Sequence, residues 1–129
     1  MSRVEVSENI GPHQLKCIDA ETGSDLTKYG AAFYSSNFTV HSYQVIISSV
    51  ESNTNLTFEI ECTNDDGGQK FDCKKDAINW QTIATYDITG ATNSNGIMYS
   101  DVWNFKYSRC KISGSIPAAK VSVIEKHNA

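Results

Sequence analysis

The histidines are the residues that could support nucleophilic catalysis. A serine or cysteine nucleophile needs a base within hydrogen-bonding reach, and many hydrolases place the serine on a Gly-x-Ser-x-Gly turn. The sequence contains no such turn, and His13, His41 and His127 lie in unrelated contexts: after a proline, at the start of a predicted strand and in the C-terminal tail. We therefore expect solvated or capping histidines, no catalytic residues and no enzymatic activity.

The four cysteines are the residues that could bind zinc. Structural zinc sites use closely spaced ligand pairs such as Cys-x-x-Cys, and Cys17, Cys62, Cys73 and Cys110 contain no such pair. The N-terminus lacks the apolar stretch of a signal peptide, so we expect the chain to fold in a cytosol with its thiols free. Cys62 and Cys73 flank one polar segment and could form a disulfide after cell lysis, which we treat as the minority outcome. No metal and no cofactor is predicted.

Four aspartates near the middle of the chain, at positions 65, 66, 72 and 76, raise the question of calcium, which binds several oxygen ligands in a flexible loop. Their spacing does not match an EF-hand loop. Asn64–Gly68 also reads as a hairpin turn, in which Asn and Asp accept local backbone hydrogen bonds and Gly supplies positive φ. We favour the turn over the ion site.

The two tryptophans offer a further alternative. Trp80 and Trp103 could form a flat platform that stacks against sugars, as in a carbohydrate-binding module. Both open stretches in which apolar and polar residues alternate, which is typical of residues that pack in a core. We therefore expect Trp80 and Trp103 to pack in the core. A sugar-binding platform is the alternative.

The charge balance excludes some partners. The chain has 15 acidic and 11 basic residues, a net charge of -4, and no basic run that could follow a phosphate backbone. No segment approaches the ~20 apolar residues of a membrane-spanning helix. Neither nucleic acid nor a membrane is a predicted partner.

Short alternating segments must position these residues. Leu56, Phe58, Ile60 and Cys62 alternate with polar residues, and the same period of two recurs around residues 43–47 and 80–88. About seven to eight such segments occur at roughly 10-residue spacing, and none has a helical period. The sequence predicts an all-β protein, an antiparallel β-sandwich of jelly-roll-like or Ig-like type.

The pattern also predicts how the chain is organised. Residues 1–12 form an N-terminal arm or irregular lead-in, residues 13–126 a single β-sandwich domain, and residues 127–129 a polar tail. The predicted core consists of residues from the alternating segments: Leu15, Val45, Ile47, Leu56, Phe58, Ile60, Trp80, Tyr86, Phe105, Tyr107, Val121 and Val123.

Three segments together resemble small β-domain virion proteins of tailed bacteriophages. They are residues 58–67, a strand that ends in an Asn-Asp-Asp-Gly turn; residues 79–84, a strand led by tryptophan; and residues 104–112, an aromatic strand centred on Arg109. The resemblance covers roughly residues 40 to 125. The chain departs from it in the insertion at residues 69–78.

The resemblance implies a structural virion protein, a capsid decoration or cement (auxiliary head) protein that binds the major capsid protein or another virion protein. A tail or head-fibre component is the alternative. It also implies a homo-oligomer, with a trimer among the arrangements considered, synthesised in the host cytoplasm and located in the virion. From the loops and the arm, we predict an interface formed by Val4, Val6, Asp66, Phe71, Lys74, Lys75, Asn93 and Asn95.

Overall fold

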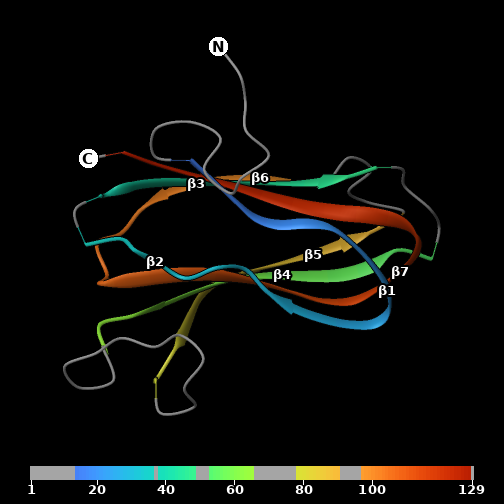
Figure 1. Cartoon of the computed structure of the whole chain (residues 1–129), viewed down its shortest axis with the longest axis horizontal. Helices are drawn as coiled ribbons and strands as arrows, with labels where there is room; N and C mark the ends of the chain where they lie inside the picture. The colour runs from blue at the N-terminus through green and yellow to red at the C-terminus, as the bar shows by residue number, and fades with distance from the viewer. Residues whose placement is uncertain (1–13, 37, 49–52, 66–77, 91–96, 129) are drawn as a thin grey trace.

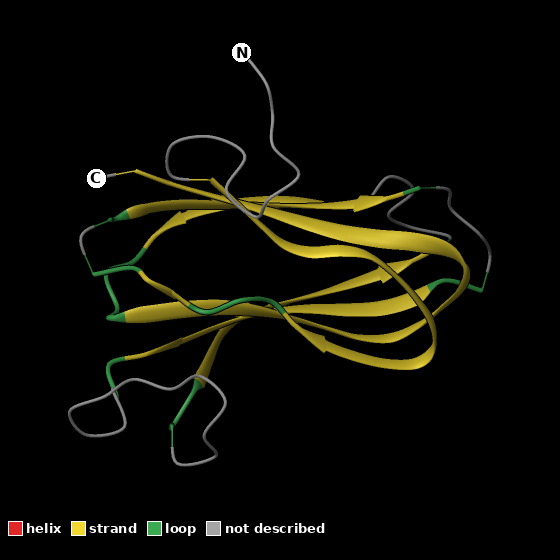
Figure 2. Cartoon of the chain, viewed as in Figure 1, coloured by secondary structure: helices red, strands yellow, loops and turns green. Residues whose placement is uncertain are grey.

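The computed structural model describes residues 14–36, 38–48, 53–65, 78–90 and 97–128. The described chain consists of strands and short connections, without a helix (Figure 2). The predicted all-β fold is confirmed. The strands are β1 (Gln14–Tyr29), β2 (Phe33–Tyr34), β3 (Val40–Ile47), β4 (Asn55–Thr63), β5 (Gln81–Thr89), β6 (Ile97–Val102) and β7 (Tyr107–Asn128).

The strands form two layers that share β1 and β7 (Figure 1). The first half of β7 pairs with β4, and β4 pairs with β5. The second half of β7 pairs with β3, and β3 pairs with β6. β1 runs antiparallel to β7 along both halves, so the two strands bend together from one layer to the other. We call the layer with β4 and β5 the β4 layer, and the layer with β3 and β6 the β3 layer.

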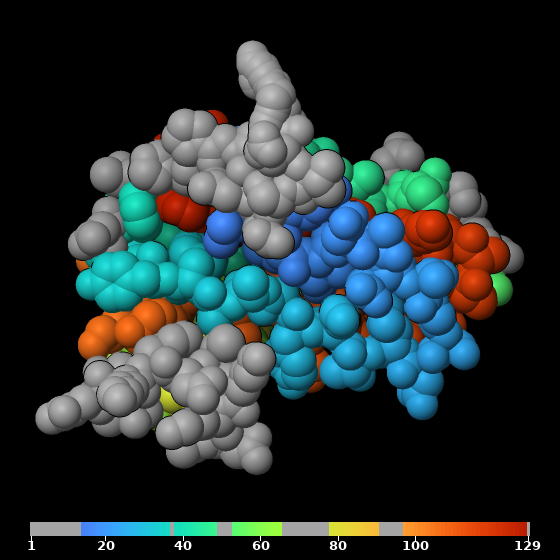
Figure 3. All heavy atoms as spheres, viewed as in Figure 1, coloured from blue at the N-terminus to red at the C-terminus, as the bar shows by residue number. Residues whose placement is uncertain are grey.

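Irregularities in β1 and β7 accompany this bend. β1 shows four register shifts between Lys16 and Leu26, and Ala20 and Asp25 adopt positive φ angles of 54° and 57°. In β7 the buried positions change parity between Ile116 and Ala119, on either side of Pro117. Bulges bend a strand and re-aim its side chains, so both halves of each strand can face the same core. Figure 3 shows β1, in blue, lying along one face of the molecule.

Hydrophobic side chains from both layers fill the space between them. The buried residues that the alternation predicts are Val45, Ile47, Leu56, Phe58, Ile60, Val121 and Val123, whereas Leu15, Trp80, Tyr86, Phe105 and Tyr107 are only partly buried. Residues outside the predicted core list complete the core, among them Ile18, Tyr43, Ile88, Trp103, Cys110, Ile112 and Ile116.

Two sequence expectations about position are wrong. Trp80 was expected on the same face as Tyr86, but a register shift opposite Ile60 and Glu61 places an extra residue, Ile83, in β5. Because side chains alternate along a strand, one extra residue moves those before it to the other face. The second expectation concerns residues 127–129: β7 continues to Asn128, so His127 is a buried strand residue and no polar tail begins there.

Candidate interaction surface

The predicted interface residues do not fall in the described structure. Val4, Val6, Asp66, Phe71, Lys74, Lys75, Asn93 and Asn95 all lie outside the described residues, as do Cys73, Asp72 and Asp76. Four features of the described chain are candidates for a functional site: a hollow beside β4 and β5, an aromatic–arginine cluster, a buried histidine–glutamate cluster and an exposed apolar surface.

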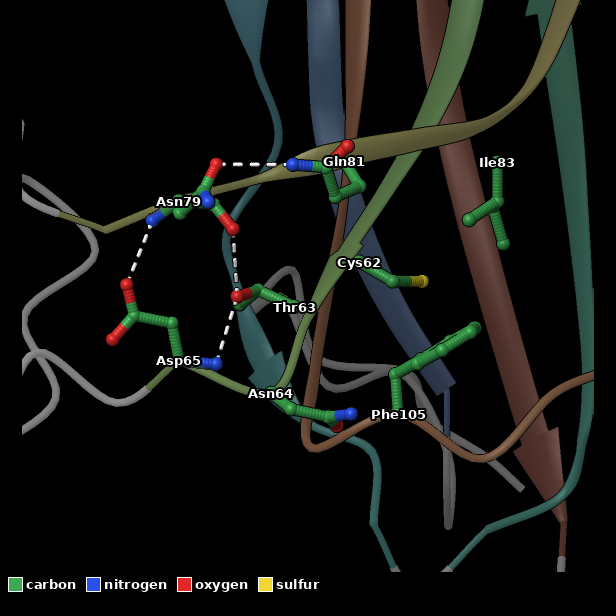
Figure 4. A pocket seen from close by; sticks show the side chains of 8 residues that line it. All are labelled: Cys62, Thr63, Asn64, Asp65, Asn79, Gln81, Ile83 and Phe105. Atoms are coloured by element: carbon green, nitrogen blue, oxygen red, sulfur yellow. Dashed lines mark hydrogen bonds between the residues drawn. The ribbon is translucent and has the colours of Figure 1, made fainter.

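The hollow lies where β4 ends and β5 begins and has a volume of about 430 Å³ (Figure 4). Its described lining contains no histidine, lysine or arginine, and the Asp65 carboxylate, its one carboxylate, accepts a hydrogen bond from the Asn79 main-chain amide. The lining residues are Cys62, Thr63, Asn64, Asp65, Asn79, Gln81, Ile83 and Phe105.

Hydrogen bonds join the polar groups of this hollow to one another. The Thr63 hydroxyl donates to the Asn79 carbonyl at 2.8 Å, and the Asp65 amide donates to the Thr63 hydroxyl at 2.9 Å (Figure 4). The main-chain amide of Asn79 donates to the Asp65 carboxylate at 2.9 Å, and the side-chain amide of Gln81 donates to the Asn79 side-chain carbonyl at 3.0 Å. These bonds tie the end of β4 to the residues before β5, the role of turn residues. Asp65 therefore acts here as a turn residue.

The aromatic–arginine cluster lies on the outer face of the β4 layer. The Arg109 guanidinium lies 4.2 Å from the ring centroid of Trp80 and 4.3 Å from that of Tyr29. Its Nε donates to Glu61 Oε1 at 2.7 Å, and the two side chains are only 14% and 11% exposed. Trp80 is thus covered by a cation on one ring face, and Trp103 is 7% exposed. Neither forms a flat sugar-stacking platform.

We expect the Arg109→Lys substitution to lower the free energy of unfolding by about 1–2 kcal/mol. Lysine keeps the charge but loses the planar group that stacks between the rings and the directed hydrogen bond to Glu61. Urea unfolding followed by circular dichroism measures the change. Lys28→Ala is the control, because its ion pair with Glu21 is long, at 3.7 Å, and half exposed; it should change stability by about 0.5 kcal/mol or less. Equal effects in both variants would contradict a special role for Arg109.

The buried histidine–glutamate cluster lies at one end of the β3 layer. Glu125 and His41 are fully buried, and His127 is 7% exposed. Nδ1 of His127 lies 2.7 Å from Glu125 Oε1, and Nδ1 of His41 lies 3.6 Å from Glu125 Oε2. The His41 ring stacks on Trp103 at 4.2 Å, and its Nε2 lies 3.0 Å from the Phe38 carbonyl oxygen. The prediction that His41 and His127 are solvated is therefore wrong.

This cluster is part of the core. Rings of Phe33 and Phe38 lie 4.9 Å and 4.4 Å from the His127 ring, so aromatic side chains enclose it. Among the described residues, no group of three or more His, Cys, Asp or Glu side chains is arranged to hold a metal ion. The cluster thus reads as a buried polar network that specifies how the end of the sandwich packs.

The exposed apolar surface lies on the outer face of β3 and β6. Val102 pairs with Val40, and Met98 with Gln44. Met98 is 76% exposed and Val102 69%, which is high for apolar side chains in paired strands. The outward positions of the two strands carry no charge: Val40, Ser42, Gln44, Ile46, Met98, Ser100 and Val102. We call these seven residues the β3–β6 surface.

Sequence reasoning missed this surface as an interface. The signal available in the sequence is Ile46, which is apolar on the otherwise polar side of its strand, whereas the predicted interface lies in loops and in the N-terminal arm. Met98 and Val102 gave no alternating signal, because they flank Ser100 and follow the Gly- and Asn-rich segment at residues 90–96. Only the pairing of β6 with β3 brings the exposed apolar residues together.

Comparisons with known proteins place the chain in no family. No family model matches it, and no curated protein matches it. Three chains of solved structures match; one belongs to Bacillus endospore appendages, described as a novel family of disulfide-linked pili. It shares 12% sequence identity with this chain over 90% of this chain and 88% of that chain, with a TM-score of 0.48. Likeness at this level carries no functional argument. In the described residues, no helix is long and apolar enough to cross a membrane.

Proposed function

We propose that this chain is a structural subunit that assembles with further copies of itself through the β3–β6 surface. The observation that carries the proposal is the pair of strongly exposed apolar side chains, Met98 and Val102, on a strand at the sheet edge. Val40 with Val102 and Ile46 beside Met98 form two apolar groups, with Ser42 and Ser100 between them. Exposed apolar patches on soluble proteins mark interaction sites. The outward positions of β3 and β6 carry no charge, which lowers the repulsion between two chains of net charge -4. The exposed carboxylate of β6, Asp101, accepts hydrogen bonds from the Tyr99 hydroxyl and the Val102 amide.

The backbone of β6 supports the same proposal. Natural edge strands are protected from pairing with other chains by bulges, charges or proline. Two long edges carry such protection: β1 has four register shifts and several charged residues, and β5 has a register shift opposite Ile60 and Glu61. β6 pairs with β3 over six consecutive residues without a shift, and Asp101 is its one charged residue. Its outer edge is therefore the regular edge to which a strand of a second copy can add.

The M98K/V102K double variant is expected to weaken self-association about a hundredfold. Each lysine removes apolar area worth roughly 1.5 kcal/mol and adds a charge to the contact, and about 2.8 kcal/mol corresponds to a factor of one hundred. Sedimentation velocity over a range of concentrations measures the dissociation constant. Ile83→Lys is the matched control, because Ile83 is 37% exposed on β5, at the edge of the other layer.

Two results would overturn the assembly proposal. One is a wild-type chain that stays monomeric at the highest concentration reached. The other is loss of association in the Ile83→Lys variant with association retained in M98K/V102K, which would move the interface to the β4 layer. Circular dichroism of each variant establishes that the sandwich is folded, so a loss of association can be assigned to the surface.

The sequence resemblance suggests a more specific setting. We propose that the assembled subunits decorate the capsid of a tailed bacteriophage by binding the major capsid protein, with a place in the tail or head fibre as the alternative. A subunit without an evident catalytic constellation in its described part, which offers an uncharged apolar surface, suits such a role. Mass spectrometry of purified virions tests it: the chain should occur in the particles in many copies. Its absence from particles whose genome encodes it would remove the virion proposal and leave the self-association proposal standing.

A further inference from the structure

Two cysteines from opposite layers meet inside the sandwich. Cys17 lies in the half of β1 that pairs with the second half of β7, in the β3 layer. Cys110 lies in the first half of β7, opposite Ile60 of β4, in the β4 layer. Cys110 is fully buried and belongs to the core, and Cys17 packs against that core while remaining partly exposed. The Cys17 thiol donates to the Leu15 carbonyl oxygen at 3.9 Å, and Cys110 is the neighbour that most raises its pKa.

Gly30 shows how closely the two residues approach. A Cβ atom placed at Gly30 would lie 2.6 Å from Cys110 Sγ and 2.9 Å from Cys17 Cβ, so both cysteines reach the same point. Gly30 is buried, and its amide donates to the Cys110 carbonyl at 2.8 Å. Its φ does not lie in the left-handed range that calls for glycine, unlike that of Gly23 or Gly114. The space taken by the two cysteines therefore accounts for the missing side chain at position 30.

We propose that Cys17 and Cys110 form an intramolecular disulfide that links the two layers of the sandwich. The pair is close because of the fold alone, since its members are far apart in the sequence and belong to different layers. A bond here would join β1 to β7 at a place where they face each other across the core and are not neighbours in one layer. It would hold the two layers together as a single covalent unit.

The bond forms by thiol–disulfide exchange with a low-molecular-weight disulfide such as oxidised glutathione. The partly exposed Cys17, as the thiolate, attacks the small disulfide and releases one small thiol. Cys110 then attacks the mixed disulfide at the Cys17 sulfur and releases the second small thiol. Two protein thiols become one disulfide, and one small disulfide becomes two thiols, so electrons and protons balance. In a reducing compartment the same exchange runs in reverse and keeps the pair open.

The surroundings of the thiols set the rate of this exchange. The neighbouring Cys110 thiol and the burial of the side chain both raise the pKa of the Cys17 thiol. The thiolate is the nucleophile, so a raised pKa slows attack in the folded protein at neutral pH. We therefore expect closure to be fast during folding in the presence of oxidised glutathione and slow when the folded, reduced protein meets it.

Cys62 provides the internal control. It is buried like Cys110, but its thiol lies 3.4 Å from the Ser108 hydroxyl. Burial raises the pKa of Cys62 to about 11, and among the described residues no thiol is its partner. Cys62 is buried like Cys110 but lies beside a hydroxyl, whereas Cys110 lies beside a thiol. Comparing the two therefore tests whether a nearby thiol, and not burial, decides which cysteines are oxidised.

The experiment refolds the full chain with oxidised glutathione, blocks the remaining thiols with N-ethylmaleimide and maps peptides by mass spectrometry. The expected result is a peptide pair joined through Cys17 and Cys110. The oxidised chain should have a melting temperature about 10 °C or more above that of the reduced chain, because the bond closes a long loop in the unfolded state. Cys62→Ala should keep this redox-dependent shift, and Cys17→Ala should lose it.

Several outcomes would overturn the proposal. Alkylation of both Cys17 and Cys110 after oxidative refolding would do so, and so would a bond from either residue to Cys62 or Cys73. A redox-dependent shift that survives in Cys17→Ala would place the responsible bond elsewhere. Cys17 is the residue to change because it is only partly buried, so its alanine variant should fold. All of these readouts are independent of self-association, so the disulfide and the β3–β6 surface can fail separately.

Discussion

The Gly114→Ala variant is expected not to reach the folded state. Gly114 has φ +120°, a conformation that L-residues rarely adopt, and it lies in β7 between Leu56 of β4 and Leu26 of β1. A Cβ atom there would clash with the Asn55 carbonyl oxygen and would lie 3.1 Å from the Leu56 Cα. Both contacts are with main chain, which cannot rotate away. β4 and β7 would have to separate, breaking the ladder that holds the β4 layer together.

Gly23→Ala is the matched control for this prediction. Gly23 also has a positive φ, +142°, but a Cβ atom there would meet no atom within 4 Å. It should therefore show only the conformational cost, about 1–3 kcal/mol, whereas Gly114→Ala adds the clash. Soluble expression and circular dichroism compare the two, with urea unfolding for variants that fold. A Gly114→Ala protein as stable as Gly23→Ala would show that β7 can shift to make room.

The Glu125→Ala variant is expected to lose about 3–5 kcal/mol of its unfolding free energy. Glu125 is fully buried, lies opposite Tyr43 of β3 and Leu15 of β1, and contacts both His41 and His127. Removal of one member of a buried polar group leaves the others desolvated without their partner and also leaves a cavity. Urea unfolding followed by tryptophan fluorescence suits this variant, because Trp103 stacks on His41.

Two further variants separate the partner effect from general damage. Glu125→Gln keeps the shape and a hydrogen-bonding group toward His127, so it should lose less than the alanine variant. Glu59→Ala removes a carboxylate from the partly exposed outer side of β4, opposite Lys111, and should cost about 1 kcal/mol or less. If Glu125→Ala and Glu59→Ala had equal stability, the histidine–glutamate cluster would have no special part in the fold.

The proposed assembly and the proposed disulfide act on different parts of the molecule. The disulfide joins the layers from inside, whereas the β3–β6 surface faces outward from one layer. A sandwich with covalently joined layers would resist separation of β3 from β4 when neighbouring copies pull on the β3 layer. Each part can be tested with the other left intact.

Regular strands could be interpreted from the sequence. Phe58 and Ile60 are buried as the alternation predicts, because β4 begins with regular pairing and its residues alternate between core and surface. The alternation in β5 was misleading at Trp80, because the extra residue Ile83 reverses which face the earlier residues occupy. A bulge of this kind depends on the partner strand, so the strand's own sequence does not reveal it.

The burial of polar residues in the core could not be predicted from the sequence for a similar reason. His41 and His127 read as surface residues because burial of an imidazole is costly without a partner. That partner, Glu125, is two residues from His127 but far in sequence from His41, and the pairing of β3 with β7 brings them together. Whether such a histidine is buried depends on a partner that only the tertiary structure supplies.

The sequence by itself determined the fold class, the main buried strands and the lack of recognisable catalytic motifs. These follow from local rules, since alternation, turn residues and motif spacing all act over a few residues. The tertiary structure decided the β3–β6 surface, the histidine–glutamate cluster and the meeting of Cys17 with Cys110. Each joins residues from strands distant in sequence, and strand order, register and bulges are settled only when the whole sandwich packs.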